Sequence, residues 1–130
     1  MPGLHLHHVA FTVRDVEASG PWYQGVFEAQ KVQEHSEPRP FHVFATSEGV
    51  VFGLVQHADT PAEDRFSETR VGLDHFAFGC SDRESLEALT RRLDGLGIPH
   101  SGIITSPAGH HINFRDPDNI ALEFFAPAAG

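Results

Sequence analysis

The feature that most constrains this chain is an internal repeat at a spacing of 67 residues, from position 8 to position 75. Moving the sequence along itself by that distance places residues 8–11 (His-Val-Ala-Phe) on residues 75–78 (His-Phe-Ala-Phe). The same shift places Asp15 on Asp82. A self-match at one fixed offset is typical of a duplicated structural unit, so the sequence predicts two copies of one fold.

The first copy has the patterns of a strand, a helix and three further strands. Residues 4–13 alternate in polarity, with Phe11 and Val13 on one face and His8 on the other, as in a half-buried strand. Aromatic and aliphatic residues then recur at helical spacing and predict a helix within residues 14–29. Short apolar runs and turn residues predict the remaining strands at 30–35, 41–46 and 50–56.

A proline determines where the first helix is expected to begin. Pro21 is poorly tolerated deep inside a helix but is acceptable in the first turn. Ser19 is therefore the predicted N-cap, and Asp15 is expected to end the preceding turn.

The second copy repeats the order of the first. Residues 73–80 read as a strand with His75 on one face, and Ser81 or Asp82 can cap the helix that follows. The last three strands are predicted at 101–105, 109–114 and 120–125.

These patterns predict an α+β fold made of two tandem βαβββ modules in a single domain. The modules cover residues 1–57 and 73–127. Residues 58–72 are polar and lack periodicity, so they are predicted to form a linker. A plain solvated connection is favoured over a loop that lies across a site.

Composition excludes several classes of protein. The formal net charge of −9, with scattered basic residues, argues against a nucleic-acid surface. No apolar run is long enough to predict a membrane span, and no secretory leader is apparent. The single cysteine excludes an internal disulfide framework and favours a cytoplasmic location.

Three side chains are candidates for a metal site. Glu123 lies between apolar neighbours in a predicted strand, and a buried carboxylate is costly unless it is paired or bound to a metal. If the two modules close on each other, His8, His75 and Glu123 all face the shared hollow. Two imidazoles and one carboxylate leave coordination positions open, which suits Fe(II) or Mn(II), with Zn(II) or Ni(II) as alternatives.

The residues of both histidine motifs and of the last turn and strand resemble the vicinal oxygen chelate superfamily. The matching stretches are residues 8–11, 74–78 and 114–124, the last containing Asp-Pro-Asp-Asn followed by Leu-Glu. This superfamily includes glyoxalase I, extradiol dioxygenases, and fosfomycin-resistance and bleomycin-resistance proteins. The resemblance implies two βαβββ modules whose sheets curl into an open barrel around a divalent metal. It also implies His8, His75 and Glu123 as metal ligands.

The resemblance does not select one branch of the superfamily. Glyoxalase I has a fourth ligand, a carboxylate, where the internal alignment places Gly53, although Gln56 or His57 could compensate. Extradiol dioxygenases usually have a tyrosine where this chain has Asn113. The potassium loop of the fosfomycin enzymes is not recognisable. Bleomycin-resistance proteins bind their ligand without metal, and the retained ligand residues argue against that class.

Strand parity predicts which residues lie beside the metal. If Ile112 and Phe114 face the helices, His111 and Asn113 face the hollow, and His111 could act as a general acid or base. A histidine exposed near a strand end is an equally good interpretation of His111. An apolar lining, which suits a hydrophobic small molecule, is predicted from Phe41, Val43, Val51 and Phe125.

The first functional hypothesis is a metal-dependent enzyme that binds a small oxygenated substrate. Oxygenase-type chemistry is preferred, and glyoxalase-type isomerase or lyase chemistry comes next. A metal-independent protein that sequesters a small molecule is the second hypothesis, and thiol addition to an electrophilic antibiotic is a third. Exposed sheet edges and the family resemblance favour a homodimer, with the site inside one chain or shared between two.

Overall fold

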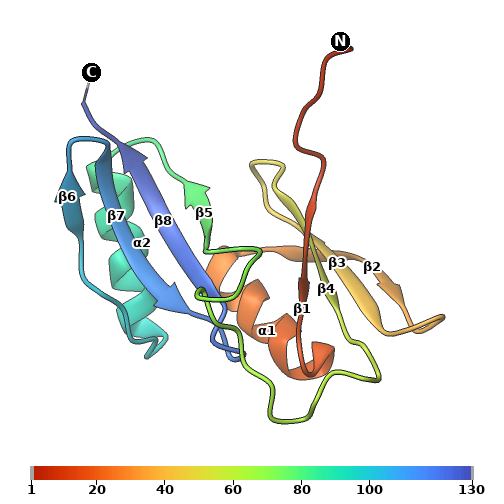
Figure 1. Ribbon diagram of the computed structural model, residues 1–130. Helices are drawn as coiled ribbons and strands as arrows, with labels where there is room; N and C mark the ends of the chain where they lie inside the picture. The colour runs from red at the N-terminus through yellow and green to blue at the C-terminus, as the bar shows by residue number, and fades with distance from the viewer. Residues whose placement is uncertain (1, 130) are drawn as a thin grey trace. The chain divides into compact units, whose positions relative to one another are not determined.

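The computed structural model describes residues 2–129. The chain divides into two compact units on either side of the bond between Asp64 and Arg65, and each unit is described by itself. Each contains one helix and one mixed four-stranded sheet (Figure 1). The predicted α+β fold of two βαβββ modules is confirmed. The curl of the sheets into an open barrel, and the module boundaries at 57 and 73, stay predictions.

The first unit has the strand order β1-β4-β3-β2. The outer strand β1 runs parallel to β4, and the other neighbours are antiparallel. Its elements are β1 (Val9–Thr12), α1 (Val16–Phe27), β2 (Gln30–His35), β3 (Phe41–Ala45) and β4 (Val51–Val55).

The second unit repeats this connectivity with the order β5-β8-β7-β6, and β5 runs parallel to β8. In Figure 1 its helix α2 lies along one face of the sheet. Its elements are β5 (Phe76–Gly79), α2 (Arg83–Gly95), β6 (Ile104–Ser106), β7 (Gly109–Arg115) and β8 (Ala121–Pro127).

Both histidine-bearing strands begin later than predicted. The strand expected at 4–13 starts at Val9, because its parallel partner β4 begins only at Val51 and pairs Val9 with Phe52. The strand expected at 73–80 starts at Phe76 for the same reason, since Phe76 pairs with Leu122 near the start of β8. His8 and His75 therefore each stand directly before a strand.

A separate core fills the space between helix and sheet in each unit. In the first, Phe11, Tyr23, Phe44 and Phe52 are at most 4% exposed, and the rings of Phe44 and Phe52 stack with centroids 5.4 Å apart. In the second, the buried side chains are aliphatic residues of α2 and aromatic and aliphatic residues of β7 and β8, among them Leu86, Leu93, Ile112, Phe114, Leu122 and Phe124.

The predicted N-cap of the first helix is wrong. Asp15, not Ser19, caps α1, and its carboxylate accepts a hydrogen bond from the Glu17 amide at 3.0 Å. Pro21 consequently lies inside the helix. A proline there costs about 3 kcal/mol. Complete burial of two side chains such as Val16 and Tyr23 contributes about as much or more, so packing outweighs the proline.

Within residues 2–129, no helix combines the length and apolar character needed to span a membrane.

Candidate metal centre

The second unit brings His75 and Glu123 together. His75 immediately precedes β5, and Glu123 lies in the middle of β8, where it pairs with Ala77 of β5. The imidazole Nε2 of His75 lies 3.4 Å from Oε2 of Glu123. The Glu123 side chain is only 13% exposed, so its charge is held close to the sheet next to this ring.

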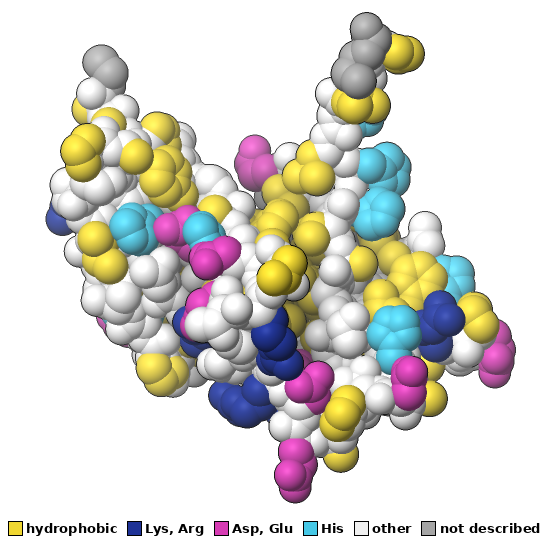
Figure 2. All heavy atoms as spheres, in the orientation of Figure 1, with side chains coloured by type: hydrophobic (Ala, Val, Ile, Leu, Met, Phe, Trp, Pro, Cys, Tyr) yellow, Lys and Arg dark blue, Asp and Glu magenta, His cyan; other side chains and the backbone are white. Residues whose placement is uncertain are grey.

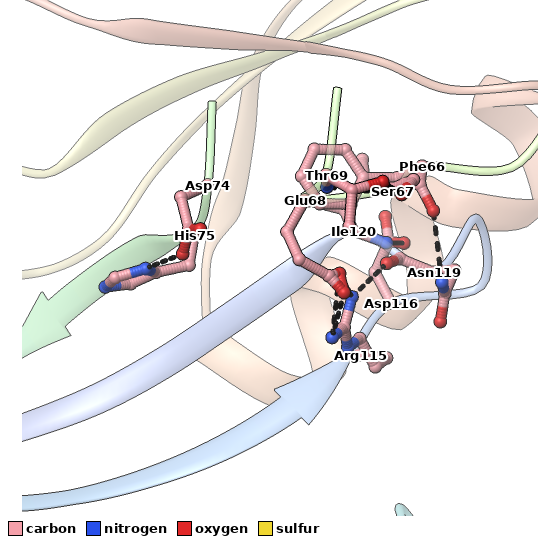
Figure 3. A network of polar contacts seen from close by, with 10 residues as sticks. All are labelled: Phe66, Ser67, Glu68, Thr69, Asp74, His75, Arg115, Asp116, Asn119 and Ile120. Carbon is pink, nitrogen blue, oxygen red and sulfur yellow. Dashed lines mark hydrogen bonds and ion pairs between the residues drawn. The ribbon is translucent and has the colours of Figure 1, made fainter. Parts of the chain in front are cut away.

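Asp74 fixes the orientation of the His75 ring (Figure 3). Nδ1 of His75 lies 2.7 Å from Oδ1 of Asp74. A carboxylate can only accept, so the ring donates its Nδ1 proton to Asp74. In the neutral ring Nε2 then carries the lone pair on the side of Glu123, which is the arrangement that carboxylate–histidine pairs give to metal-binding imidazoles.

His111 and Asn113 lie on the same face of the sheet as Glu123. Ile112 and Phe114, between and beside them on β7, are at most 3% exposed and face the helix, as parity predicted. Nε2 of His111 lies 3.9 Å from Oε1 of Glu123, and Asn113 is directly opposite Glu123 in the β7–β8 pairing. Figure 2 shows histidine and acidic side chains side by side on this unit.

The two carboxylate oxygens of Glu123 thus each face one imidazole nitrogen. Two ligands that share one ion at about 2.1 Å from it, at right angles, lie about 3 Å apart. The 3.4 Å between His75 and Glu123 fits that spacing, and the 3.9 Å to His111 exceeds it. A neutral nitrogen and a carboxylate oxygen are also suitable donors for a divalent transition metal.

The third predicted ligand, His8, belongs to the first unit. It stands directly before β1, as His75 stands before β5, and its Nδ1 lies 2.8 Å from Nδ1 of His7. Both rings are exposed to solvent.

Strand pairing confirms that Gly53 is the first unit's counterpart of Glu123. Gly53 pairs with Ala10 of β1, just as Glu123 pairs with Ala77 of β5. Gln56 does not replace the missing carboxylate on that face, because its Oε1 accepts a hydrogen bond from the Val16 amide at the start of α1. The first unit therefore offers a histidine without the neighbouring acid.

A turn before β8 holds the strand that carries Glu123 (Figure 3). Oδ1 of Asp116 accepts hydrogen bonds from the amides of Asp118 and Ile120 at 2.8 and 2.7 Å. Part of the predicted linker lies against this turn, since the Asn119 side chain donates to the Phe66 carbonyl. These contacts fix where β8 begins.

An ion pair reinforces the same turn. Arg115 donates to Glu68 through both terminal nitrogens, and its Nη1 also donates to the Asn119 carbonyl. The Arg115 guanidinium, which hydrogen-bonds the carboxylate, lowers the pKa of Glu68. The Arg115 side chain therefore stabilises this turn.

Sequence reasoning missed two groups of polar residues. Asp74 received no role, although its position next to His75 in the repeated motif was a usable signal. Carboxylate oxygens of Glu17 and Glu34 and a ring nitrogen of His42 lie within 4.8 Å of one another in the first unit. The usable signal among these three residues is His42, which interrupts the apolar run predicted as a strand at residues 41–46.

Comparison with known proteins identifies the family. The model of the Glyoxalase/Bleomycin resistance protein/Dioxygenase superfamily matches residues 5–124. An uncharacterized Bacillus subtilis protein, YqjT, is 26% identical over 132 residues, covering 95% of this chain and 99% of that protein.

Solved structures agree in fold. A glyoxylase/bleomycin resistance protein/dioxygenase domain from Frankia is 31% identical with a TM-score of 0.89, covering 98% of this chain and 94% of that one. The fosfomycin resistance protein FosX from Listeria monocytogenes, complexed with Mn(II) and sulfate, is 22% identical with a TM-score of 0.72, covering 98% and 92%. This chain, in which each half repeats one βαβββ unit, belongs to the Glyoxalase/Bleomycin resistance protein/Dioxygenase superfamily, the group also called vicinal oxygen chelate proteins.

Proposed function

We propose that this protein is a metal-dependent enzyme that acts on a small, oxygenated and largely hydrophobic substrate. His8, His75 and Glu123 are the proposed ligands of one divalent cation. The observation that carries the proposal is the 3.4 Å contact between Nε2 of His75 and Oε2 of Glu123, with Asp74 behind the ring. This contact has the donor chemistry and the spacing of two ligands on one ion.

Mn(II) and Fe(II) are the preferred cations. The donor set of two imidazoles and one carboxylate suits both, and Zn(II) or Ni(II) are alternatives. The Mn(II) complex of FosX, a protein of similar fold, supports the choice of Mn(II). When bound, such a cation polarises a substrate oxygen and, as Fe(II), also supports reaction with O₂.

The residues around Glu123 are proposed to handle the substrate. His111, whose side chain is 22% exposed, is the candidate general base or acid, because an imidazole can both accept and donate a proton. The amide of Asn113, one strand from Glu123, can donate a hydrogen bond to a substrate oxygen. Phe125 follows on the same strand face as Glu123 and supplies apolar surface.

Oxygenase-type chemistry is the preferred subclass. A glyoxalase-type isomerase or lyase comes second, because Gly53 provides no fourth ligand and the Gln56 side chain is bound to the start of α1. A metal-independent binding protein is the second hypothesis, favoured if binding of a hydrophobic ligand survives a chelator, and thiol addition to an electrophilic antibiotic is the third, favoured if a thiol is consumed.

Metal analysis of three ligand variants tests the proposal. Protein purified without added metal, and then reconstituted with Mn(II) or Fe(II), is expected to contain one ion at the proposed site. His8→Ala, His75→Ala and Glu123→Ala should each weaken its affinity at least tenfold. His110→Ala is the matched control, since its ring contacts Thr105 and Arg83 rather than Glu123. Full occupancy in all three ligand variants would reject the proposal.

Oxygen uptake with a panel of aromatic diols separates the subclasses. An oxygenase consumes O₂ only when both substrate and Fe(II) are present, whereas an isomerase or lyase converts its substrate under nitrogen as well as under air.

A further inference from the structure

His42 is a buried histidine that the proposed reaction does not use. His42 lies in β3 and is only 4% exposed, and its ring lies near that of Phe44 on the same face of the strand. It faces the helix side of the sheet. Gly53 faces the opposite side, because it pairs with Val43, the next residue along β3. His42 therefore lies on the other side of the sheet from the position equivalent to Glu123.

Two carboxylates from two other elements meet this buried ring. Glu34 of β2 is the direct cross-strand partner of His42, and its Oε1 lies 3.2 Å from His42 Nε2. Oε1 of Glu17, in the first turn of α1, lies 3.9 Å from the same nitrogen. All three donor atoms lie within 4.8 Å of one another.

One of the three side chains is buried and the other two are exposed, so the exposed carboxylates can adjust their positions around an ion held by the buried ring. The His42 side chain is 5% exposed and fixed, whereas those of Glu34 and Glu17 are 56% and 77% exposed. A cation needs ligand atoms about 3 to 3.5 Å apart. Glu34 already meets that spacing. Glu17 reaches it by a small rotation of an exposed chain.

We infer that Glu17, Glu34 and His42 form a second cation site that holds a divalent first-row transition metal, with Zn(II) favoured. One imidazole and two carboxylates offer two negative charges and leave a position for water, which suits four-coordinate zinc. This site does not depend on the function proposed above.

The expected role of the cation is to join an exposed edge strand to the helix. All six residues of β2 are exposed, and the strand pairs along one side only, with β3. Lys31 Nζ lies 2.9 Å from the same Oε1 of Glu34 and forms an ion pair with it. A bound cation would replace a contact within β2 by one that spans α1, β2 and β3.

The test uses the full chain with the other proposed site removed. In a His8→Ala/His75→Ala/Glu123→Ala background, Zn(II) titration is expected to show one site per chain. Adding Glu17→Gln and Glu34→Gln should weaken its Kd at least a hundredfold. Glu48→Gln, in the exposed turn between β3 and β4, is the matched control and should leave the Kd unchanged.

Residue-level readouts locate the ion and exclude binding to the N-terminal histidines. Zn(II) is expected to shift the Nε2 resonance of His42 and to slow amide hydrogen exchange in residues 30–35 at least tenfold. Both effects should disappear in the Glu17→Gln/Glu34→Gln chain. Absence of both effects in the background chain would show that these residues form an ion pair only, and their persistence after the two substitutions would show that the two carboxylates do not hold the ion. Circular dichroism before titration confirms that each variant is folded.

Discussion

A carboxylate between two imidazoles is the residue-scale feature on which the proposed chemistry depends. Strand parity alone predicted that Glu123, His111 and His75 would share one face, since side chains alternate along a strand. The pairing of Asp74 with His75 could not be predicted in the same way. It depends on the rotamers of two exposed side chains, which no periodicity encodes.

Asp74 should act on the metal through His75. Asp74→Asn keeps an acceptor oxygen but removes the charge that holds the Nδ1 proton, so the hydrogen bond that orients the ring becomes weaker. We expect Mn(II) to bind about 10- to 100-fold more weakly, as for other partners of ligand histidines. Calorimetric titration measures this, and Asp59→Asn, in an exposed turn, is the control. An unchanged affinity would show that Asp74 does not position the ring.

At the scale of single elements, the two helices show which local features the internal repeat could predict. Asp82 caps α2 by accepting from the Ser85 amide at 2.8 Å, and Asp15, its counterpart at the repeat offset, caps α1. The repeat thus contained the right cap. The rule that prolines avoid helix interiors favoured Ser19 instead. Pro21 is visible in the local sequence, whereas the burial of side chains that offsets its cost depends on tertiary packing, which the local sequence does not show.

The cap of α2 should make stability depend on pH. The backbone hydrogen bond from Ser85 lowers the pKa of Asp82 below its usual value. A carboxyl whose pKa is lower in the folded state contributes stability above its unfolded pKa, and this contribution is lost as the pH falls through the folded value. The effect should therefore appear below about pH 4.

Urea unfolding of Asp82→Asn at neutral and at acid pH measures this contribution. The variant should be less stable than the parent at pH 7, and the difference should shrink as the pH is lowered from about 4, because the parent then loses the stability that its ionised cap contributes. Asp59→Asn again serves as the control. If the variant is destabilised by the same amount at both pH values, the loss of stability comes from the changed shape of the side chain rather than from its charge.

At the scale of the whole molecule, the repeat offset was sufficient to predict two units with one connectivity. The order of strands and helix along each half follows from it, whereas the equivalence of Gly53 with Glu123 needed a slightly larger shift of 70 residues and is seen in the strand pairing. What it could not predict is whether His8 meets His75 and Glu123 in its own chain or in a partner. The repeat in the sequence is the same whether the site forms within one chain or between two chains.

Mixing two defective chains tests for a shared site. If the site forms between the chains of a dimer, His8→Ala and Glu123→Ala complement each other, because each hybrid dimer has one intact ligand set. Co-refolding in equal amounts should then restore about a quarter of the wild-type metal occupancy. If each site lies within one chain, the mixture should bind no more metal than the separate variants. Metal analysis after gel filtration gives the answer together with the size of the assembly.

The glycine at position 53 also has a consequence for how the halves can be recombined. A hybrid chain in which the second half is joined to another copy of itself would carry two histidines and two glutamates. That is the four-donor complement associated with glyoxalase I. A chain built from two first halves would carry a histidine before each first strand and no carboxylate at the position of Glu123. The two halves are thus alike in architecture but not exchangeable in chemistry, and one missing side chain makes the difference.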